Sequence, residues 1–424
     1  MADNTTTAPP EAEPSPVAAD LLDERLIKSQ GVSGLAKMLW NRLRSGELGS
    51  LPVVLGLVII SAVFYAREPI FLSSRNLVSI TQFAAPIGII SLGIVLVLLL
   101  GEIDLSVGSV SGFAAACMAV LVVNKGHSMV FGVLAALLIG LAIGAFYAVL
   151  YNRIGVPSFV FSLAGLLAFQ GALLYVLGTD GTINLPADSG LVDFARYKFL
   201  GDTTSYVLVL LIVLAYLGSQ MWSYRARKAA GLSTPWLAIV GIKTAALAIG
   251  LGWLTYYLNI DKGWSYLWLL FALLVVLMDF ALRRTKWGRH LFAVGGNEEA
   301  SRRSGIKVNR VYFSVFALCS VMAALGGLLA AAQLTSVSQS SGTTDTNLTA
   351  IAAAVIGGTS LFGGRGSAYS AMLGILVLQA IQNGLNLINV DSSVRFMITG
   401  AVLLLAVGID SVSRRPAPRA VAVD

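Results

Sequence analysis

The sequence has little charge and few residues that bind metals or form disulfides. Asp, Glu, Lys and Arg make up 12% of its 424 residues, whereas 56% are hydrophobic and the mean hydropathy is +0.80. A soluble fold is excluded, because a soluble chain of this length needs more charge to cover its surface. Cys117 and Cys319 stand in apolar runs, and His127 and His290 are isolated in predicted loops. None of them has metal-ligand spacing, so no metal site is expected.

Catalytic and nucleotide-binding motifs are also missing. The sequence contains no G-x-x-x-x-G-K-[ST] motif, so the chain does not bind ATP through a P-loop. It shows no nucleophile and base at a recognisable spacing, which makes an enzyme improbable. The net charge is +7, but the cations gather in predicted loops. Membrane topology explains that distribution better than a nucleic-acid partner does.

The sequence is instead rich in long apolar runs. A helix crosses a bilayer with ~20 apolar residues, and such runs recur from Leu48 to Val412. We predict an all-α, polytopic bundle of 10–12 transmembrane helices, the range reflecting two pairs of runs that could be re-entrant. The predicted spans are 48–66, 79–100, 106–123, 129–151, 158–178, 205–222, 235–258, 265–282, 311–334, 347–363, 367–389 and 395–412.

The positive charges predict the topology. With the N-terminus inside, the inside loops and tails carry 21 Lys and Arg residues and the outside loops carry seven, while Lys243 falls within a span. This bias predicts that both termini are cytoplasmic. We expect a transmembrane domain at 48–412, an N-terminal tail at 1–47 that is partly disordered with an amphipathic helix at 21–43, and a C-terminal tail at 413–424. The outside loops are short, so a separate protein must capture any solute.

A polar, basic segment at 283–310 separates two long apolar runs and carries eight Lys and Arg residues. Gly295-Gly296 is predicted to break the chain, and Asn297 suits a helix cap. The residues from Asn297 to Ser304 can then form two short helical turns. Such a cytoplasmic helix is suited to contacting another protein, and we predict that this protein is an ATP-hydrolysing subunit.

Glu102 and Asp104 interrupt a long apolar region. A carboxylate costs about 2.5–3.5 kcal/mol at the centre of a bilayer unless it is paired or faces water. The two residues therefore line a solute route, or they hold a broken helix in place. The favoured interpretation is structural: the break lies at the cytoplasmic interface and Asp104 caps the next helix through amides near Val107. A proton relay is a third interpretation, although no intramembrane His or Lys accompanies the pair.

Four amide side chains share one face of a predicted helix, because Gln379, Gln382, Asn383 and Asn386 are spaced at i, i+3, i+4 and i+7. Amides donate and accept hydrogen bonds without charge, which suits a neutral sugar. Hydrogen bonding between helices of the bundle explains the same pattern equally well. The stripe is therefore either part of the solute pathway or a packing contact.

Two Gly-rich breaks resemble one another. GEIDLSVGS (101–109) and GGTSLFGGRGS (357–367) each follow an Ala-containing apolar run and precede a small-residue helix. By the predicted topology both breaks fall on the same side of the membrane. Their similarity indicates either a parallel repeat of a helix–break–helix unit or chance.

Three motifs in order resemble one family. GEIDLSVGS, GGNEEASRRSGI (295–306) and AAVIGGTSLFGGRGS (353–367) followed by NGLNLI (383–388) look like the permease subunit of bacterial monosaccharide ABC importers. The resemblance spans about Leu48 to Val412. The additional apolar segment at 235–258 is more similar to the xylose type than to the shorter ribose type, which implies a pentose such as xylose as the solute.

The resemblance implies a set of partners. These are a second permease copy around a central pathway, an ABC ATPase subunit that binds ATP and Mg²⁺, an extracytoplasmic sugar-binding protein and membrane lipid; this chain itself would hold no cofactor. An ion-coupled secondary sugar transporter that uses Glu102 and Asp104 is the alternative. Carried over by motif, the helix that contacts the ATPase comprises Gly296, Asn297, Glu298, Ala300, Ser304, Gly305 and Ile306.

Overall fold

The computed structural model describes residues 51–230 and 237–413, and the chain forms two units. The larger unit comprises residues 49–205 and 255–424, and the smaller unit contains residues 206–254 among those described. The predicted tail at 1–47 lies outside the described residues, as does the predicted tail at 413–424 apart from its first residue.

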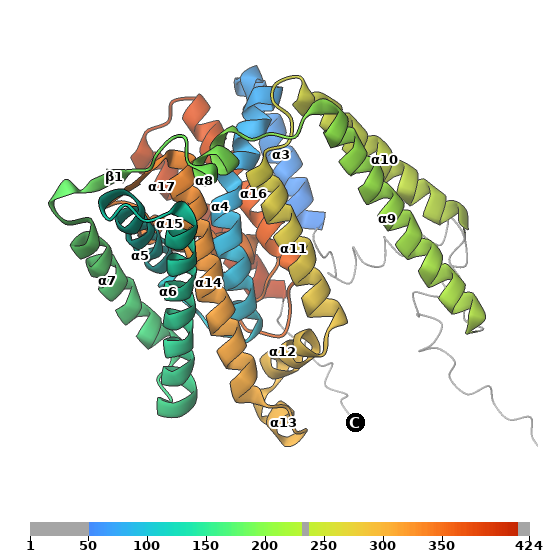
Figure 1. The fold of residues 1–424 in the computed structure, drawn as a ribbon. Helices are drawn as coiled ribbons and strands as arrows, with labels where there is room; N and C mark the ends of the chain where they lie inside the picture. Colours follow the sequence, from blue (N-terminus) through green and yellow to red (C-terminus); the bar gives the residue numbers. More distant parts are fainter. Residues whose placement is uncertain (1–50, 231–236, 414–424) are drawn as a thin grey trace, which may run out of the picture. The chain divides into compact units, whose positions relative to one another are not determined.

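The larger unit is a helical bundle (Figure 1). Its helices are α3 (Leu51–Arg67), α4 (Ser74–Leu99), α5 (Val107–Ala119), α6 (Met129–Val149), α7 (Ser158–Leu177), α8 (Gly190–Val192), α11 (Tyr266–Arg284), α12 (Lys286–Gly296), α13 (Glu298–Arg303), α14 (Val308–Leu334), α15 (Thr344–Ile356), α16 (Ala368–Leu387) and α17 (Ser392–Ser413). Two of them continue as π-helical turns, η3 (Val120–Asn124) after α5 and η4 (Leu150–Ile154) after α6.

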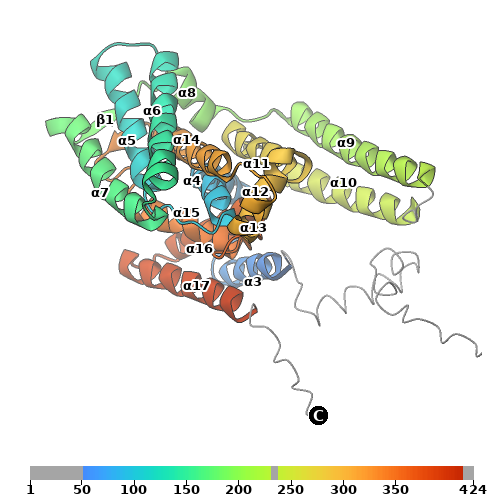
Figure 2. The ribbon, with the colours of Figure 1, turned by 90° about the horizontal axis from the view of Figure 1, so that it is seen from below.

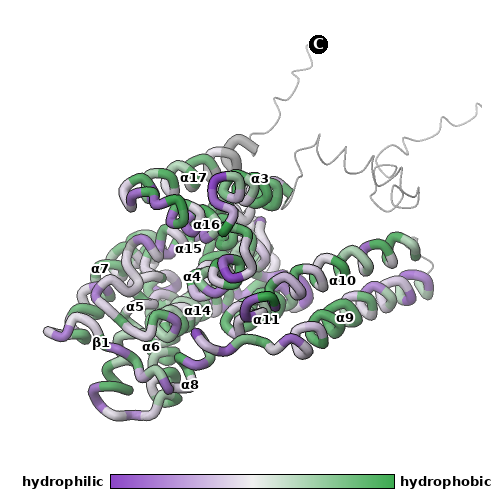
Figure 3. Tube along the Cα trace, turned by 90° about the horizontal axis from the view of Figure 1, so that it is seen from above, coloured by the Kyte–Doolittle hydropathy of each residue, from purple (hydrophilic) through white to green (hydrophobic). Residues whose placement is uncertain are grey.

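The smaller unit is formed by most of α9 (Asp202–Ala229) and α10 (Leu237–Asn259). Few residues of either helix are buried, as expected for helices in contact with lipid. Hydrophilic residues gather at the C-terminal end of α9 (Figure 3), where Arg227 and Lys228 occupy the last turn. This hairpin contains the additional apolar segment predicted at 235–258.

The helices agree in part with the predicted 10–12 spans, since nine candidates are found among the described residues. Each of the twelve predicted runs contains a helix, and nine helices in the described part of the chain are long and apolar enough to cross a membrane. The prediction at 347–363 extended too far: α15 ends at Ile356, and Gly358 then takes a left-handed φ of 101°. Residues 357–367 therefore form a connection between α15 and α16.

The fold is not purely helical. Two three-residue strands, β1 (Thr182–Asn184) and β2 (Ser336–Ser338), pair antiparallel, with Ile183 opposite Val337. Both central side chains are buried. This pair was not predicted, since strands this short have no detectable alternation of apolar and polar residues.

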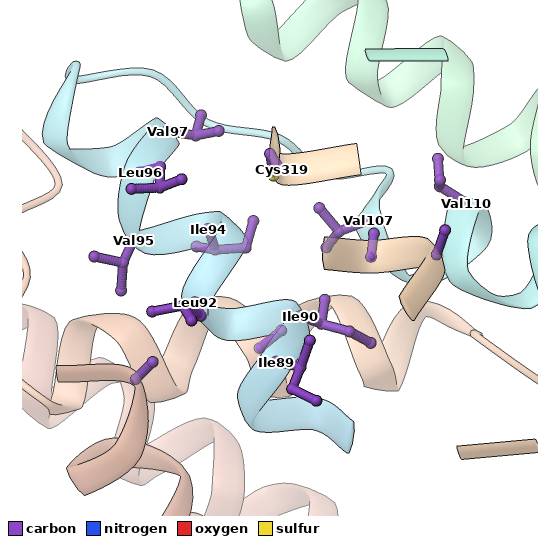
Figure 4. Close-up of a cluster of buried hydrophobic side chains, with 14 of the residues drawn as sticks. Ile89, Ile90, Leu92, Ile94, Val95, Leu96, Val97, Val107, Val110 and Cys319 are labelled. Atoms are coloured by element: carbon purple, nitrogen blue, oxygen red, sulfur yellow. The ribbon is translucent and has the colours of Figure 1, made fainter. Parts of the chain in front are cut away.

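The core of the bundle is built on α4 and α14. In their most apolar stretches, 83% of α4 and 78% of α14 are buried, against 28% in α6 and α7. Ile89 to Val97 of α4 pack beside Val107 and Val110 of α5 and Cys319 of α14 (Figure 4). Helices α4 and α14 therefore occupy the centre, and the helices around them present apolar residues outward.

Small residues allow α6 to approach α14 closely. Gly140 and Gly144, one turn apart on α6, face Ser320 and the Phe316–Ala317 backbone of α14. A Cβ on Gly144 would lie 2.7 Å from the Cα of Ala317. This is the close packing that small residues at i and i+4 permit between membrane helices.

We expect Gly144→Val to destabilise the larger unit, because the added methyl groups would separate α6 from α14, and overpacking of this kind costs about 1–3 kcal/mol. Gly171→Val on α7 is the matched control, since a Cβ there has no atom within 4 Å. Thermal unfolding in detergent, followed by tryptophan fluorescence, should show a lower midpoint for Gly144→Val than for Gly171→Val. Equal midpoints would contradict the packing described here.

Candidate functional site

Three motifs that are distant in sequence meet at one end of the larger unit, which Figure 2 views from below. The Gly364 N–H donates to the Leu99 carbonyl at 2.9 Å and so joins the break at 357–367 to the break after α4. Gly295 lies against the same carbonyl, and a Cβ at this position would overlap it. The two breaks do lie on the same side, next to the last turn of α12. We call this the α13 end of the bundle.

The segment 283–310 contains two helices where the sequence predicted one. Helix α12 begins after Thr285, whose hydroxyl accepts a hydrogen bond from Gly288 N at 3.2 Å, and it continues through Gly296. The chain breaks at Asn297, one residue after the predicted glycine pair. Asn297 Oδ1 accepts from Ala300 N at 2.8 Å, which confirms the predicted cap of α13.

Helix α13 is short, and ion pairs between its own side chains stabilise it. Arg302 pairs with Glu298 at 2.7 Å and Arg303 pairs with Glu299 at 3.0 Å, both at i, i+4 spacing. The acidic residues lie in its first turn and the basic residues in its last, as the helix dipole favours. Gly305 follows with a left-handed φ of 84°, a conformation that ends the helix and favours glycine.

The seven residues predicted to contact an ATPase lie on α13 or directly beside it, and they differ in exposure. Five of them are exposed: Gly296, Asn297, Ala300, Ser304 and Gly305. Glu298 and Ile306 are half-buried and face the bundle, where Ile306 packs against the main hydrophobic core. The exposed residues are free for a partner, and the other two hold α13 to the rest of the chain.

Two tyrosines connect the inner face of α13 to the break after α4. The Tyr312 hydroxyl donates to Glu298 Oε2 at 3.2 Å, and the Tyr312 ring stacks on Tyr151 with ring centres 4.3 Å apart. The Tyr151 hydroxyl donates to Glu102 Oε1 at 2.7 Å. We call these four residues the tyrosine bridge. The sequence analysis identified neither tyrosine as a functional residue. Tyr151 is oriented by a π-helical turn, which the sequence analysis did not predict.

A cavity of about 470 Å³ lies beside the tyrosine bridge at the α13 end. It is bounded by α13, the start of α14, the end of α6 and the connection to α7. Its lining residues are Glu102, Tyr151, Asn152, Gly155, Val156, Pro157, Glu298, Arg302 and Asn309. Glu102 therefore borders a hydrated space at the α13 end and does not lie in an apolar interior.

Asp104 is buried, with 1% of its surface exposed. Its Oδ1 accepts from the backbone N–H of Ser106 at 2.8 Å and from the Ser106 hydroxyl at 2.7 Å. Tyr147 in turn donates to that hydroxyl at 2.9 Å. Burial raises the pKa of the Asp104 carboxyl, and the bonds from Ser106 oppose the rise. The predicted cap near Val107 is not formed: Asp104 bonds Ser106, the residue before α5, and the helix begins without a side-chain cap.

The predicted amide stripe of α16 splits into two parts. Asn383 exchanges hydrogen bonds with Asn76 of α4 at 2.8 and 3.0 Å, which is a packing contact. Gln382 and Asn386 line a cavity of about 220 Å³, which we call the α17 cavity. Gln379 is half-buried and is not among the residues that line this cavity.

Comparison with known proteins identifies the family. A family model described as "Branched-chain amino acid transport system / permease component" matches residues 76–407. The xylose transport system permease protein XylH of Escherichia coli K12 is 36% identical over 88% of this chain and 94% of its own length. The chain belongs to this family of ABC transporter permeases. No solved structure matches it.

Other relatives agree with this assignment. The xylose transport system permease protein XylH of Haemophilus influenzae is 33% identical over 88% of the permease and 99% of the relative. The ribose import permease protein RbsC of E. coli K12 is 30% identical over 84% of the permease and 92% of the relative.

Family membership confirms that the permease is a multi-pass membrane protein of a bacterial ABC transporter and a transport subunit without a catalytic role. Permeases of ABC transporters work with ATPase and binding-protein subunits. The ion-coupled alternative for Glu102 and Asp104 is therefore not retained. Within the described ranges, no group of three His, Cys, Asp or Glu side chains is placed to hold a metal ion.

We expect Tyr312→Phe to loosen α13, because the substitution removes the hydroxyl that donates to Glu298. A hydrogen bond to a charged group contributes about 1.5–3 kcal/mol, and each 1.4 kcal/mol corresponds to about a tenfold change in an opening equilibrium. Hydrogen–deuterium exchange over 297–306 should accelerate by about tenfold or more. Tyr175→Phe, at a tyrosine that is 88% exposed, is the control. Unchanged exchange over 297–306 in Tyr312→Phe would show that the tyrosine bridge does not hold α13.

Proposed function

We propose that this permease forms the translocation pathway of a bacterial ATP-driven importer for a monosaccharide, most simply a pentose such as xylose. An external binding protein delivers the sugar, and a separate ABC ATPase binds ATP and Mg²⁺. A second copy of the permease completes the pathway. The observation that carries the proposal is α13, a capped helix with one face exposed and the other fixed to the core through the tyrosine bridge.

The charges support placing the α13 end in the cytoplasm. Exposed cations at this end include Lys286, Arg289, Arg302, Arg303 and Lys307. Loops on the cytoplasmic side of bacterial membrane proteins carry such an excess of Lys and Arg. In this topology residues 48–412 form the transmembrane domain, both termini are cytoplasmic, and α13 faces the compartment that contains ATP.

The relatives support a sugar over the amino acid in the description of the family model. The matching proteins XylH and RbsC are described as xylose and ribose permeases, and each aligns with more than four-fifths of this chain. The amides Gln382 and Asn386, which line the α17 cavity, are consistent with this class of solute, because carboxamides bind hydroxyl groups without requiring charge.

In the proposed mechanism the ATPase docks on the exposed residues Asn297, Ala300, Ser304 and Gly305. When two ATPase domains close on ATP, they displace α13. The displacement reaches the break at 101–106 through the tyrosine bridge, and it reaches α11 and α14 through their direct continuity with α12 and α13. Helices on either side of the central translocation pathway then tilt, and the pathway changes from outward-facing to inward-facing.

We expect Ala300→Trp to abolish the stimulation of ATP hydrolysis by sugar-loaded binding protein in the reconstituted transporter. The bulky ring would occupy the exposed face of α13 without disturbing its inner contacts. Ala226→Trp, at an exposed alanine near the basic end of α9, is the matched control and should retain the stimulation. Membrane insertion of both variants is checked by size-exclusion chromatography. If Ala300→Trp retained full stimulation, the docking site would have to be elsewhere.

A further inference from the structure

The α17 cavity takes no part in the contacts at the α13 end. It lies among α15, α16 and α17, and it contains five residues that the sequence did not single out. Its lining residues are Asp345, Gln382, Asn386, Ser392, Arg395, Phe396 and Thr399. The volume of about 220 Å³ is on the scale of a small polar molecule.

The cavity lies well away from the α13 end. Gln382 is fourteen residues along α16 from Ala368, which corresponds to about 20 Å at the rise of an α-helix. Asp345 is eleven residues before Ile356, the last residue of α15, which corresponds to about 16 Å. Asn386 and Ser392, which also line the cavity, stand on either side of the turn between α16 and α17, so the cavity lies toward the end of these helices that is remote from the break at 357–367.

The side chains of the cavity are not suited to contact with lipid. Asp345 and Asn386 are exposed, and Arg395 is half-buried. Ionisable residues inside a membrane face water or other protein, because contact with lipid tails is costly. This face of α15, α16 and α17 is therefore suited to meet water or another protein, and not lipid tails.

The polar atoms of the cavity are largely free for a ligand. Among the described residues, Asp345, Gln382 and Asn386 form no side-chain hydrogen bond or ion pair. Arg395 donates from Nη2 to Ser392 Oγ at 2.7 Å, but its Nε is buried and has no partner in the described chain. A buried donor without a partner is destabilising, and a ligand hydroxyl would relieve that cost.

We infer that the α17 cavity is a binding site for the monosaccharide in transit, an inference that rests on the proposed function. Asp345 accepts from sugar hydroxyls, Arg395 donates to them, and Gln382 and Asn386 do both. The exposed ring of Phe396 supplies an apolar surface for the C–H face of the sugar. The carboxylate and the guanidinium disfavour anionic and cationic solutes respectively.

A zwitterionic amino acid is the competing ligand, since Asp345 and Arg395 also complement an ammonium and a carboxylate group. The remaining lining favours the sugar. Among the described lining residues it consists of two amides and two hydroxyl residues with a single aromatic ring, and none of these offers an aliphatic surface for a branched side chain.

The test uses the complete transporter, with permease, ATPase and binding protein in proteoliposomes. Uptake of labelled D-xylose and L-leucine is measured together with ATP hydrolysis. Gln382→Leu and Arg395→Gln should lower D-xylose uptake by about tenfold or more, as expected where polar groups of a site lose their ligand contacts. Stimulation of ATP hydrolysis by the binding protein and assembly of the complex should remain. Gln170→Leu on α7 is the matched control and should transport normally.

The outcomes separate the two proposals. If the unaltered transporter shows no ATP-dependent uptake of D-xylose, the proposed function fails. If it takes up D-xylose but Gln382→Leu and Arg395→Gln transport as well as Gln170→Leu, the cavity is not a sugar site. Preferential uptake of L-leucine that these two variants abolish would assign the cavity to amino acids and overturn the inference.

Discussion

The arrangement of this permease depends on a constraint that the bilayer imposes. Lipid offers no hydrogen-bond partners, so a helix that breaks within the bundle must find partners in the protein. The break after α4 draws on several other elements. Ile103 N is satisfied by Ser158 of α7, Gly108 N by Asn347 of α15, Ser106 N by Asp104 and the Leu99 carbonyl by Gly364 N.

These contacts make the break a junction of the fold. A displacement of any one of α7, α15 or the 357–367 connection alters the partners of the same short segment. The tyrosine bridge adds α13 to this set, since it ends on Glu102 at the edge of the break. A displacement of α13 can therefore be transmitted through these contacts to α15, the helix that carries Asp345 of the α17 cavity.

Hydropathy and motif spacing predicted most of the architecture. Every predicted apolar run contains a helix, because burial in a bilayer requires such runs whatever the tertiary contacts. The cap at Asn297 was also predictable, since capping is a local interaction. The extent of α12 was not, because the close contact of Gly295 with the Leu99 carbonyl and Gly364, which leaves no room for a side chain there, is a tertiary contact.

The functional residues were harder to predict for the same reason. Spacing grouped Asn383 with Gln382, yet Asn383 bonds to Asn76, 307 positions earlier in the chain. Tyr151 and Tyr312 belong to apolar spans that give no sign of their roles, and their stacking exists only in three dimensions. Local sequence determines which face of a helix a residue occupies, whereas tertiary packing determines what that face meets.

The central claim is that a separate ATPase docks on α13 and drives transport by displacing it. The most direct measurement is accumulation of labelled D-xylose in proteoliposomes that contain the permease with or without its ATPase, under an imposed proton or sodium gradient. The account predicts accumulation only when the ATPase, the binding protein and ATP are all present. Accumulation by the permease alone, driven by an ion gradient, would contradict it.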